Sequence, residues 1–390
     1  MNVFDYLKWR GDVPLSVAPF NEVDNLILSE LAYTDFSGIV PESGQEVPLR
    51  EAYEAYFSSH TREEIQASKS FTARSPLLME PMCSGARFGD MKLTAYRDER
   101  NTQADLQFSA VTFLLSDGSA YAAFRGTDGT LVGWKEDFLF SYLSGTEGQQ
   151  RAAEYLRRDA GEIGRPLRAG GHSKGGNLAV YAAACCGEET QDRLTAVYSN
   201  DGPGFRLEFL AGEEYQRIVP KIVSIVPDTS VIGLLMDSSV RPRVVRSTAS
   251  GIMQHDGFTW ETERDGFAEA KLSETSKMLR QMLSGWLDQM DDGDRKELTE
   301  TIFGLLSATG ENTFSGISES RWKSLEAMAA SALKLPKENL QEMGRYLTQL
   351  GKSGGKTVSA LLQSRVAELL RTAGSILPQA GAKPEKIEQP

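Results

Sequence analysis

The sequence predicts an α/β protein with a mainly parallel sheet, followed by an all-helical region. Between residues 91 and 248, short apolar segments alternate with helical ones, which is the pattern of a parallel sheet covered by helices. At residues 167–186 a strand passes into a helix of small residues through a glycine-rich turn. Beyond residue 265 the chain contains only amphipathic helical segments and a polar tail.

The first ninety residues predict a helical layer ahead of the sheet. Residues 21–31 carry apolar side chains at helical spacing, and residues 50–58 form a second helical segment. Thr61 and Glu64 have the spacing of a capping box, which opens a third helix.

From Met91 the apolar residues alternate with a period of two, which is typical of strands. We expect strands at residues 91–97, 106–115 and 119–124, and the Asp-Gly pair at residues 117–118 favours a hairpin between the last two. The last strand runs into a polar loop that contains Gly126 and Thr127. Open α/β sheets place their sites at such strand ends, and a helix at residues 146–163 follows.

Residues 171–175, Gly-His-Ser-Lys-Gly, fit the G-x-S-x-G pattern of a nucleophile elbow. In this turn the serine backbone adopts a strained, positive-φ conformation that projects Oγ away from the sheet. Side chains two positions before or after the serine would collide with neighbouring elements, so glycine is needed at 171 and 175. A strand end before the motif and a helix directly after it supply the expected context. Ser173 is therefore the predicted nucleophile.

Apolar segments at residues 194–199, 221–226 and 243–248 predict three further strands. The first two are each followed by an aspartate, Asp201 and Asp228, and the loop after the third contains His255. Serine nucleophiles of the α/β-hydrolase fold are followed along the chain by an acid and then by a histidine base. The order of residues here meets that requirement.

Three histidines compete for the role of general base. His172 adjoins the serine on the turn, so its side chain should point away from Oγ, toward a packing role. His60 precedes the nucleophile and lies outside the sheet pattern. His255 follows the last strand and is the predicted base.

For the acid we favour Asp228, because it ends a strand between Ser173 and His255. Asp201 ends the preceding strand and remains the rival, and Asp256 or no acid at all stays open. If neither strand-end carboxylate takes part, Asp228 is simply a turn residue after Pro227.

Together these segments resemble a known family. Phe-Arg-Gly-Thr at 124–127, Trp134 with Asp137, and Gly-His-Ser-Lys-Gly-Gly at 171–176 resemble the class 3 lipase pattern. Residues 198–204 and 254–256 are more similar to an uncharacterised bacterial branch of lipase-related α/β-hydrolases. The resemblance covers residues 23–260. It implies Ser173 as nucleophile, Asp228 as acid and His255 as base.

The resemblance also implies an oxyanion hole. The backbone amides of Lys174 and Thr127 would bind the oxyanion, and Asp137 would orient the Thr127 hydroxyl. Lys174 replaces the usual leucine after the serine. Its side chain either places a cation beside the mouth of the site, which favours an anionic acyl substrate over triglyceride, or is a solvated lysine at a helix start.

Composition limits the classes of partner and compartment. The formal net charge of −12 argues against a nucleic-acid partner and against electrostatic docking on an anionic membrane. The three cysteines, at positions 83, 185 and 186, form neither a disulfide framework nor a metal-ligand pattern. No signal-peptide pattern opens the sequence, and no apolar run is long enough to span a membrane. We therefore expect a cytoplasmic protein.

We expect three regions: a lipase-like hydrolase domain at 1–265 with its helical lead-in, a helical subdomain or cap at 266–377, and a disordered tail at 378–390. Contact of the C-terminal helices with a membrane surface or a protein partner is the alternative to a cap. The amphipathic helices are expected at residues 271–290, 295–307, 318–333, 337–350 and 358–373.

The predicted function is a serine ester hydrolase, lipase- or esterase-like, which acts on acyl or lipid esters through an acyl-enzyme intermediate. This chemistry requires no cofactor and no metal. Two alternatives stay open: a thioesterase or amidase that uses the same site, and a non-catalytic helical scaffold with a vestigial site.

Overall fold

An eight-stranded sheet organises the part of the chain that this computed structural model describes, which is residues 1–307 and 309 without 43, 69, 102–105, 128–134, 136–137 and 308. The spatial order of the strands follows the chain, and the pairs from β4 to β8 are parallel while those from β1 to β4 are antiparallel. This is the predicted α/β-hydrolase fold. The strands are β1 Val47–Pro48, β2 Lys92–Asn101, β3 Leu106–Leu114, β4 Ala120–Phe124, β5 Leu167–His172, β6 Leu194–Asn200, β7 Ile222–Pro227 and β8 Arg243–Val245.

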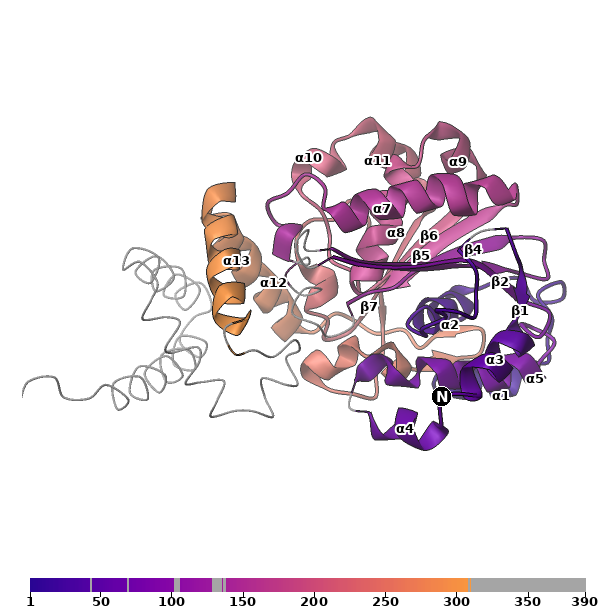
Figure 1. Cartoon of the computed structure of the whole chain (residues 1–390). Coiled ribbons are helices and arrows are strands. Elements are labelled where there is room, and N and C mark those ends of the chain that lie inside the picture. The colour runs from indigo at the N-terminus through magenta and orange to yellow at the C-terminus, as the bar shows by residue number, and fades with distance from the viewer. Residues whose placement is uncertain are drawn as a thin grey trace, which may run out of the picture.

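Helices cover both faces of the sheet (Figure 1). Because consecutive parallel strands are neighbours, right-handed crossovers place all the connecting helices on one face. These helices are α7 Glu147–Tyr155, α8 Lys174–Cys185, α9 Glu188–Arg193, α10 Leu207–Leu210 and α11 Glu213–Ile218. The helices before the sheet cover the opposite face, and they are α1 Val3–Arg10, α2 Glu22–Leu31, α3 Leu49–Phe57, α4 Arg62–Ala67 and α5 Met79–Ser84.

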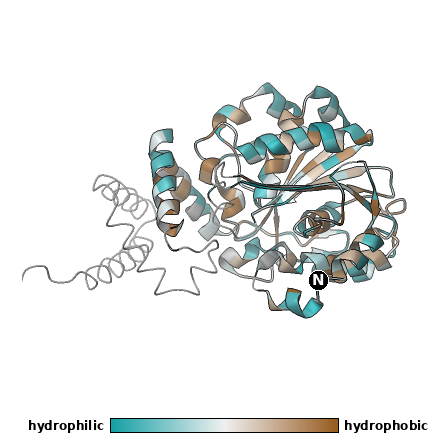
Figure 2. Cartoon of the chain, viewed as in Figure 1, coloured by the Kyte–Doolittle hydropathy of each residue, from teal (hydrophilic) through white to brown (hydrophobic). Residues whose placement is uncertain are grey.

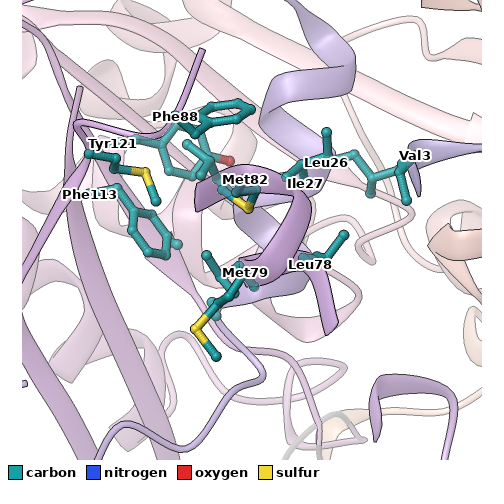
Figure 3. Close-up of a cluster of buried hydrophobic side chains, with 14 of the residues drawn as sticks. Val3, Leu26, Ile27, Leu78, Met79, Met82, Phe88, Phe113 and Tyr121 are labelled. Atoms are coloured by element: carbon teal, nitrogen blue, oxygen red, sulfur yellow. The ribbon is translucent and has the colours of Figure 1, made fainter. Parts of the chain in front are cut away.

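Helix α2 forms the centre of the N-terminal layer, and all ten of its residues are buried. Its N-cap Asn21 makes a capping box with Asp24. The Asp24 carboxylate is fully buried and accepts hydrogen bonds from the equally buried Arg87 guanidinium, so this charge is paired where it is desolvated. Figure 3 shows the apolar cluster around α2, which includes Val3, Leu26, Ile27, Leu78, Met79, Met82, Phe88, Phe113 and Tyr121.

On the other face, small residues bring α8 close to the sheet. A Cβ built on Gly176 would lie 2.8 Å from Ser199 Oγ and 3.1 Å from Ser199 Cα, so only glycine fits at this contact. Ala179, Ala182 and Ala183 are fully buried in the second apolar core. Figure 2 shows hydrophobic segments concentrated in the interior of the domain and hydrophilic residues on the outer sides of the helices.

The beginning of the chain packs beside the segment that carries His255. The Thr262 amide donates to the Met1 carbonyl oxygen over 2.8 Å, and the Phe4 ring stacks on Phe258 with centroids 5.5 Å apart. His255 lies on the 3₁₀ segment η6 Gly251–His255, η7 Gly257–Thr259 comes next, and the short hairpin of β9 Thr262–Glu263 and β10 Gly266–Phe267 follows.

Two of the expected C-terminal helices are present as α12 Glu274–Leu287 and α13 Asp292–Ser307. The other three expected helices and the expected tail lie outside the described residues. Within the described part of the chain, none of the helices has the length and apolar character needed to cross a membrane.

Candidate active site

Ser173 sits on the predicted sharp turn between β5 and α8. Its φ of 57° and ψ of −131° are unusual for a residue with a side chain, and its amide is held by the Asn200 carbonyl oxygen at 2.9 Å. A Cβ on Gly171 would lie 2.3 Å from the Gly175 carbonyl carbon, and one on Gly175 would lie 2.1 Å from the Phe124 carbonyl oxygen. The local geometry of an elbow is therefore as predicted.

His255 lies directly against the serine. Its Nε2 is 2.9 Å from Ser173 Oγ, and its Nδ1 is 2.7 Å from Asp201 Oδ2. A carboxylate oxygen accepts hydrogen bonds, so the Nδ1–H group of His255 donates this bond to Asp201 and keeps its proton. Nε2 is then left with a lone pair that accepts the hydrogen bond from the Ser173 hydroxyl.

The carboxylate that contacts His255 belongs to Asp201, so the expectation that Asp228 would do so is wrong. Asp228 Oδ1 accepts a long hydrogen bond of 3.4 Å from Thr229 Oγ1 instead. Strand adjacency explains the difference. β6 is the direct neighbour of β5, with Asn200 paired to His172, whereas β7 lies one strand further away. Neighbouring strands are about 4.8 Å apart, so the aspartate after β6 emerges beside the elbow.

Asp201 is held in place by several donors. Its side chain is 1% exposed, and Oδ1 accepts hydrogen bonds from the Ser230 hydroxyl and, at 3.1 Å, from the Gly233 amide. A Cβ on Gly233 would lie 2.3 Å from this oxygen, so glycine is required there. These bonds leave Oδ2 directed at the histidine.

The two amides proposed for an oxyanion hole lie at the ends of adjacent strands. Thr127 follows β4, whose last residue Phe124 pairs with Gly171 of β5, and the position of a Gly126 Cβ is only 2.5 Å from the His172 carbonyl oxygen. Lys174 is the first residue of α8, where the helix dipole is positive. Asp137 lies outside the described residues.

The side chain of Lys174 is neither at the mouth of the site nor solvated, so both expectations for it are wrong. The residue is 1% exposed, and Nζ donates to the Gln107 carbonyl oxygen at 2.8 Å and to Gln107 Oε1 at 3.2 Å. Gln107 belongs to β3, so the lysine side chain extends from the start of α8 toward that strand, into the protein. Its charge is thus removed from any substrate at Ser173.

Comparison with protein-family models assigns this chain to a family. The Mbeg1-like family model matches residues 82–304, which is more than half of the chain. The chain belongs to the Mbeg1-like family. The match begins within α5, includes the whole sheet from β2 onward and ends within α13.

Solved structures similar to this Mbeg1-like chain carry the names of lipases. They include the M37 lipase, with 15% identity, a TM-score of 0.34 and coverage of 54% of this chain and 69% of that one. The native Rhizomucor miehei lipase propeptide complex has 12% identity, a TM-score of 0.35 and coverage of 56% and 86%. The lipase from Rhizopus microsporus var. chinensis has 14% identity, a TM-score of 0.33 and coverage of 62% and 87%. A comparison with curated protein sequences gives no match.

Behind His255 the Mbeg1-like chain buries a second imidazole beside a carboxyl group. The His172 ring lies 4.7 Å from the His255 ring between centroids, and His172 Nδ1 is 3.5 Å from Glu30 Oε1. Burial, and then the nearby His255, lower the pKa of His172 well below its ordinary value, while burial and the Asp256 carboxylate raise that of Glu30. Burial thus disfavours the charged form of both groups, and His172 has the packing role expected of it.

The remaining histidine is remote from this cluster. His60 stacks on Tyr56 with ring centroids 4.2 Å apart, and its Nδ1 is 3.0 Å from the Tyr56 carbonyl oxygen. It thus belongs to the surface turn after α3, outside the sheet as expected. Glu30 was missed by sequence reasoning, although an acidic residue within the apolar repeat of residues 21–31 was a visible signal.

The segment that carries His255 is anchored on both sides. Gln254 receives a hydrogen bond at its carbonyl oxygen from Trp260 Nε1 at 2.9 Å and one at Oε1 from the Thr229 amide at 2.7 Å. Asp256 pairs with Arg74 at 2.5 Å. The base is therefore positioned by contacts from the N-terminal layer and from the turn after β7.

Helix α13 packs on the segment that precedes α7. The Arg295 guanidinium donates to the Ser141 carbonyl oxygen at 2.6 Å, and the Phe138 and Phe303 rings meet at 5.4 Å. Arg206 makes two hydrogen bonds of 3.0 Å to the Asp292 carboxylate. The described part of the helical region thus rests on the hydrolase body through contacts with Phe138, Ser141 and Arg206 (Figure 1).

Proposed function

We propose that this protein is a serine ester hydrolase of lipase or esterase type, which acts on acyl or lipid esters through an acyl-enzyme intermediate. The observation that carries this proposal is the hydrogen-bonded chain from Ser173 through His255 to Asp201, on a strand-to-helix turn with a positive φ at the serine. Nucleophile, base and orienting acid are all within hydrogen-bonding distance, which is the arrangement that activates a serine hydroxyl.

In the first step Ser173 Oγ attacks the ester carbonyl carbon while His255 Nε2 accepts the hydroxyl proton. The new C–O bond forms and the carbonyl π electrons move onto the oxygen. Asp201 holds the neutral imidazole in the required tautomer and stabilises the imidazolium that forms. Because Asp201 is buried and His255 is largely buried, this electrostatic stabilisation is stronger than it would be in water.

The tetrahedral oxyanion would be bound by the amides of Lys174 and Thr127. Losing one such donor costs on the order of a hundredfold in turnover. When the intermediate collapses, the leaving alcohol takes the proton from His255. Water then attacks the acyl-enzyme with His255 as base, which releases the carboxylic acid and restores Ser173.

The test is intact-mass analysis after incubation with a fluorophosphonate probe. We expect one adduct on the wild type and none on Ser173→Ala, with His255→Ala and Asp201→Asn strongly slowed. Asp228→Asn is the matched control, because it makes the same change at a strand-end aspartate that does not contact His255, and it should label like the wild type.

Ester, thioester and amide substrates assayed side by side then decide the leaving group. An unreactive wild type that remains folded in the presence of probe, with no turnover of any substrate, would overturn the proposal in favour of a non-catalytic scaffold. Labelling that survives Ser173→Ala would assign the reactivity to another residue.

A further inference from the structure

A cavity of about 320 Å³ lies beside the loop that carries Asp201. Its walls come from the residues that follow β6, from the segment 233–242 and from α12. Gly202 and Gly233 are both part of the lining. Gly233 donates its amide to Asp201 Oδ1, and a Cβ on Gly202 would lie 2.8 Å from the Ser173 carbonyl oxygen. The cavity therefore adjoins the candidate triad on the far side of the acid.

The wall formed by segment 233–242 is fixed by backbone pairing. The Gly204 amide donates to the Leu235 carbonyl oxygen and the Phe205 amide to the Asp237 carbonyl oxygen, each over 2.8 Å. Met236, between these two acceptors, has a φ of 62°, a conformation that is costly for a residue with a long side chain. Strained residues of this kind tend to cluster at ligand sites and are kept only where the surrounding contacts hold them.

Two guanidinium groups, those of Arg241 and Arg280, line the cavity, and no carboxylate is among its lining residues. In the described ranges, no hydrogen bond or ion pair joins either arginine to another residue. The nearby Arg206, by contrast, is paired with Asp292. In a chain of net charge −12, an arginine pair without an acidic neighbour in the lining creates a local site for an anion.

The rest of the lining is mixed. Apolar side chains include those of Val180, Leu234, Leu235, Met236 and Val240, and four serine hydroxyl groups, at positions 199, 224, 238 and 239, could add hydrogen bonds to an anion. A second cavity of about 300 Å³ shares Gly204, Phe205 and Met236 with the first. Its own walls include Phe140, Leu143, Tyr181 and Phe209. Arg206 and Glu208 also line the second cavity. Two cavities with common walls, the first with arginines and no carboxylate and the second rich in aromatic residues, suit a ligand that has an anionic end and an apolar end.

We propose that the arginine-lined cavity binds the anionic head group of an amphiphile, a carboxylate or phosphate attached to an acyl chain. Arg241 and Arg280 would hold the anion, and the apolar walls would cover the chain. The proposal rests on the proposed function only in treating the cavity as a subsite of an ester hydrolase, since binding itself does not require an active Ser173.

The test is isothermal titration of the full chain carrying Ser173→Ala with dodecyl phosphate and with laurate. Dodecyl maltoside serves as the neutral amphiphile, and inorganic phosphate as the anion without a chain. We expect both anionic amphiphiles to bind, and Arg241→Gln and Arg280→Gln each to weaken binding about tenfold, which is the value of one charge-assisted hydrogen bond. Arg157→Gln is the matched control, because it removes one exposed arginine that lines neither cavity.

Equal loss of affinity in Arg157→Gln, or no loss in the double variant, would overturn the proposal. Equally tight binding of dodecyl maltoside would also refute it, since the arginines would then have no role. A preference between laurate and dodecyl phosphate identifies the head group. If Ser173→Ala binds the anionic amphiphiles but the wild type is not labelled by the fluorophosphonate, the anion site is supported and the hydrolase proposal fails. The failures of the two proposals are therefore distinguishable.

Discussion

Replacing Asp201 with asparagine tests the order of the proposed triad. Oδ1 of Asp201 accepts hydrogen bonds from the Gly233 amide and the Ser230 hydroxyl. An asparagine would keep its carbonyl oxygen on that side, because both partners can donate to it. Its NH₂ group would then face His255 Nδ1 at the position where Oδ2 now lies 2.7 Å away.

An amide in that position donates to Nδ1 and forces the proton of the imidazole onto Nε2. The base then has no lone pair to accept the proton of Ser173. The same change in a serine protease triad lowers turnover by on the order of 10⁴-fold, which corresponds to roughly 5 kcal/mol of transition-state stabilisation. We expect a loss of that order in kcat, with little change in KM.

The assay is hydrolysis of p-nitrophenyl butyrate by wild type, Asp201→Asn and Asp228→Asn, with thermal unfolding measured for each. Asp228→Asn should stay within a few-fold of the wild type. If Asp201→Asn kept more than a tenth of the wild-type kcat while Asp228→Asn lost most of it, the assignment of Asp201 rather than Asp228 as the triad acid would be refuted.

Three further changes test the framework around the site. Gly175→Ala should destabilise the fold by about 1–3 kcal/mol, because its Cβ would meet the Phe124 carbonyl oxygen at 2.1 Å. Gly285→Ala is the control, since open space surrounds that position, and it should be neutral or stabilising. Urea unfolding of both variants measures the difference. Glu30→Gln should change how stability depends on pH. Burial raises the pKa of Glu30 in the folded state above its ordinary value of 4.5, so the folded protein holds this proton more tightly than the unfolded chain does. Wild-type stability should therefore fall as the pH rises from 4.5, and the variant should lack this contribution, which thermal unfolding between pH 4.5 and 8 would reveal. Arg206→Ala removes the contact with Asp292 and should increase hydrogen exchange in α13 with little effect on the sheet. Unchanged exchange in α13 would show that Arg295 and the contact between Phe138 and Phe303 are enough to hold this helix.

The sequence predictions succeeded where a structural feature depends on residues that are close together in the sequence. The elbow depends on two glycines and a serine within five residues, so its geometry at Ser173 was predictable. His255 was identified because the order of residues left it as the histidine that follows the last strand. Hydrophobic periodicity also located the strands of the sheet to within a few residues, apart from the two-residue β1.

The sequence predictions failed where the role of a residue depends on which distant segments lie side by side in the fold. Asp201 and Asp228 satisfy the same chain order, and only the pairing of β6 with β5 brings the first of them to His255. The direction of the Lys174 side chain depends on a contact with Gln107, 67 positions earlier in the sequence, which no local pattern encodes. Glu30 contacts His172 across 142 positions of sequence, so this contact could not be inferred from either segment alone.

The contact between Met1 and Thr262 also bears on the order in which the protein acquires reactivity during synthesis. Ser173 precedes His255 by 82 positions, and the segment bearing His255 packs against Met1 and Phe4. Contacts of such long sequence separation are slow to form because a large loop must close first. A nascent chain that has emerged only as far as α11 contains Ser173 and Asp201 but not His255, so its serine would have no base until the rest of the domain has been made.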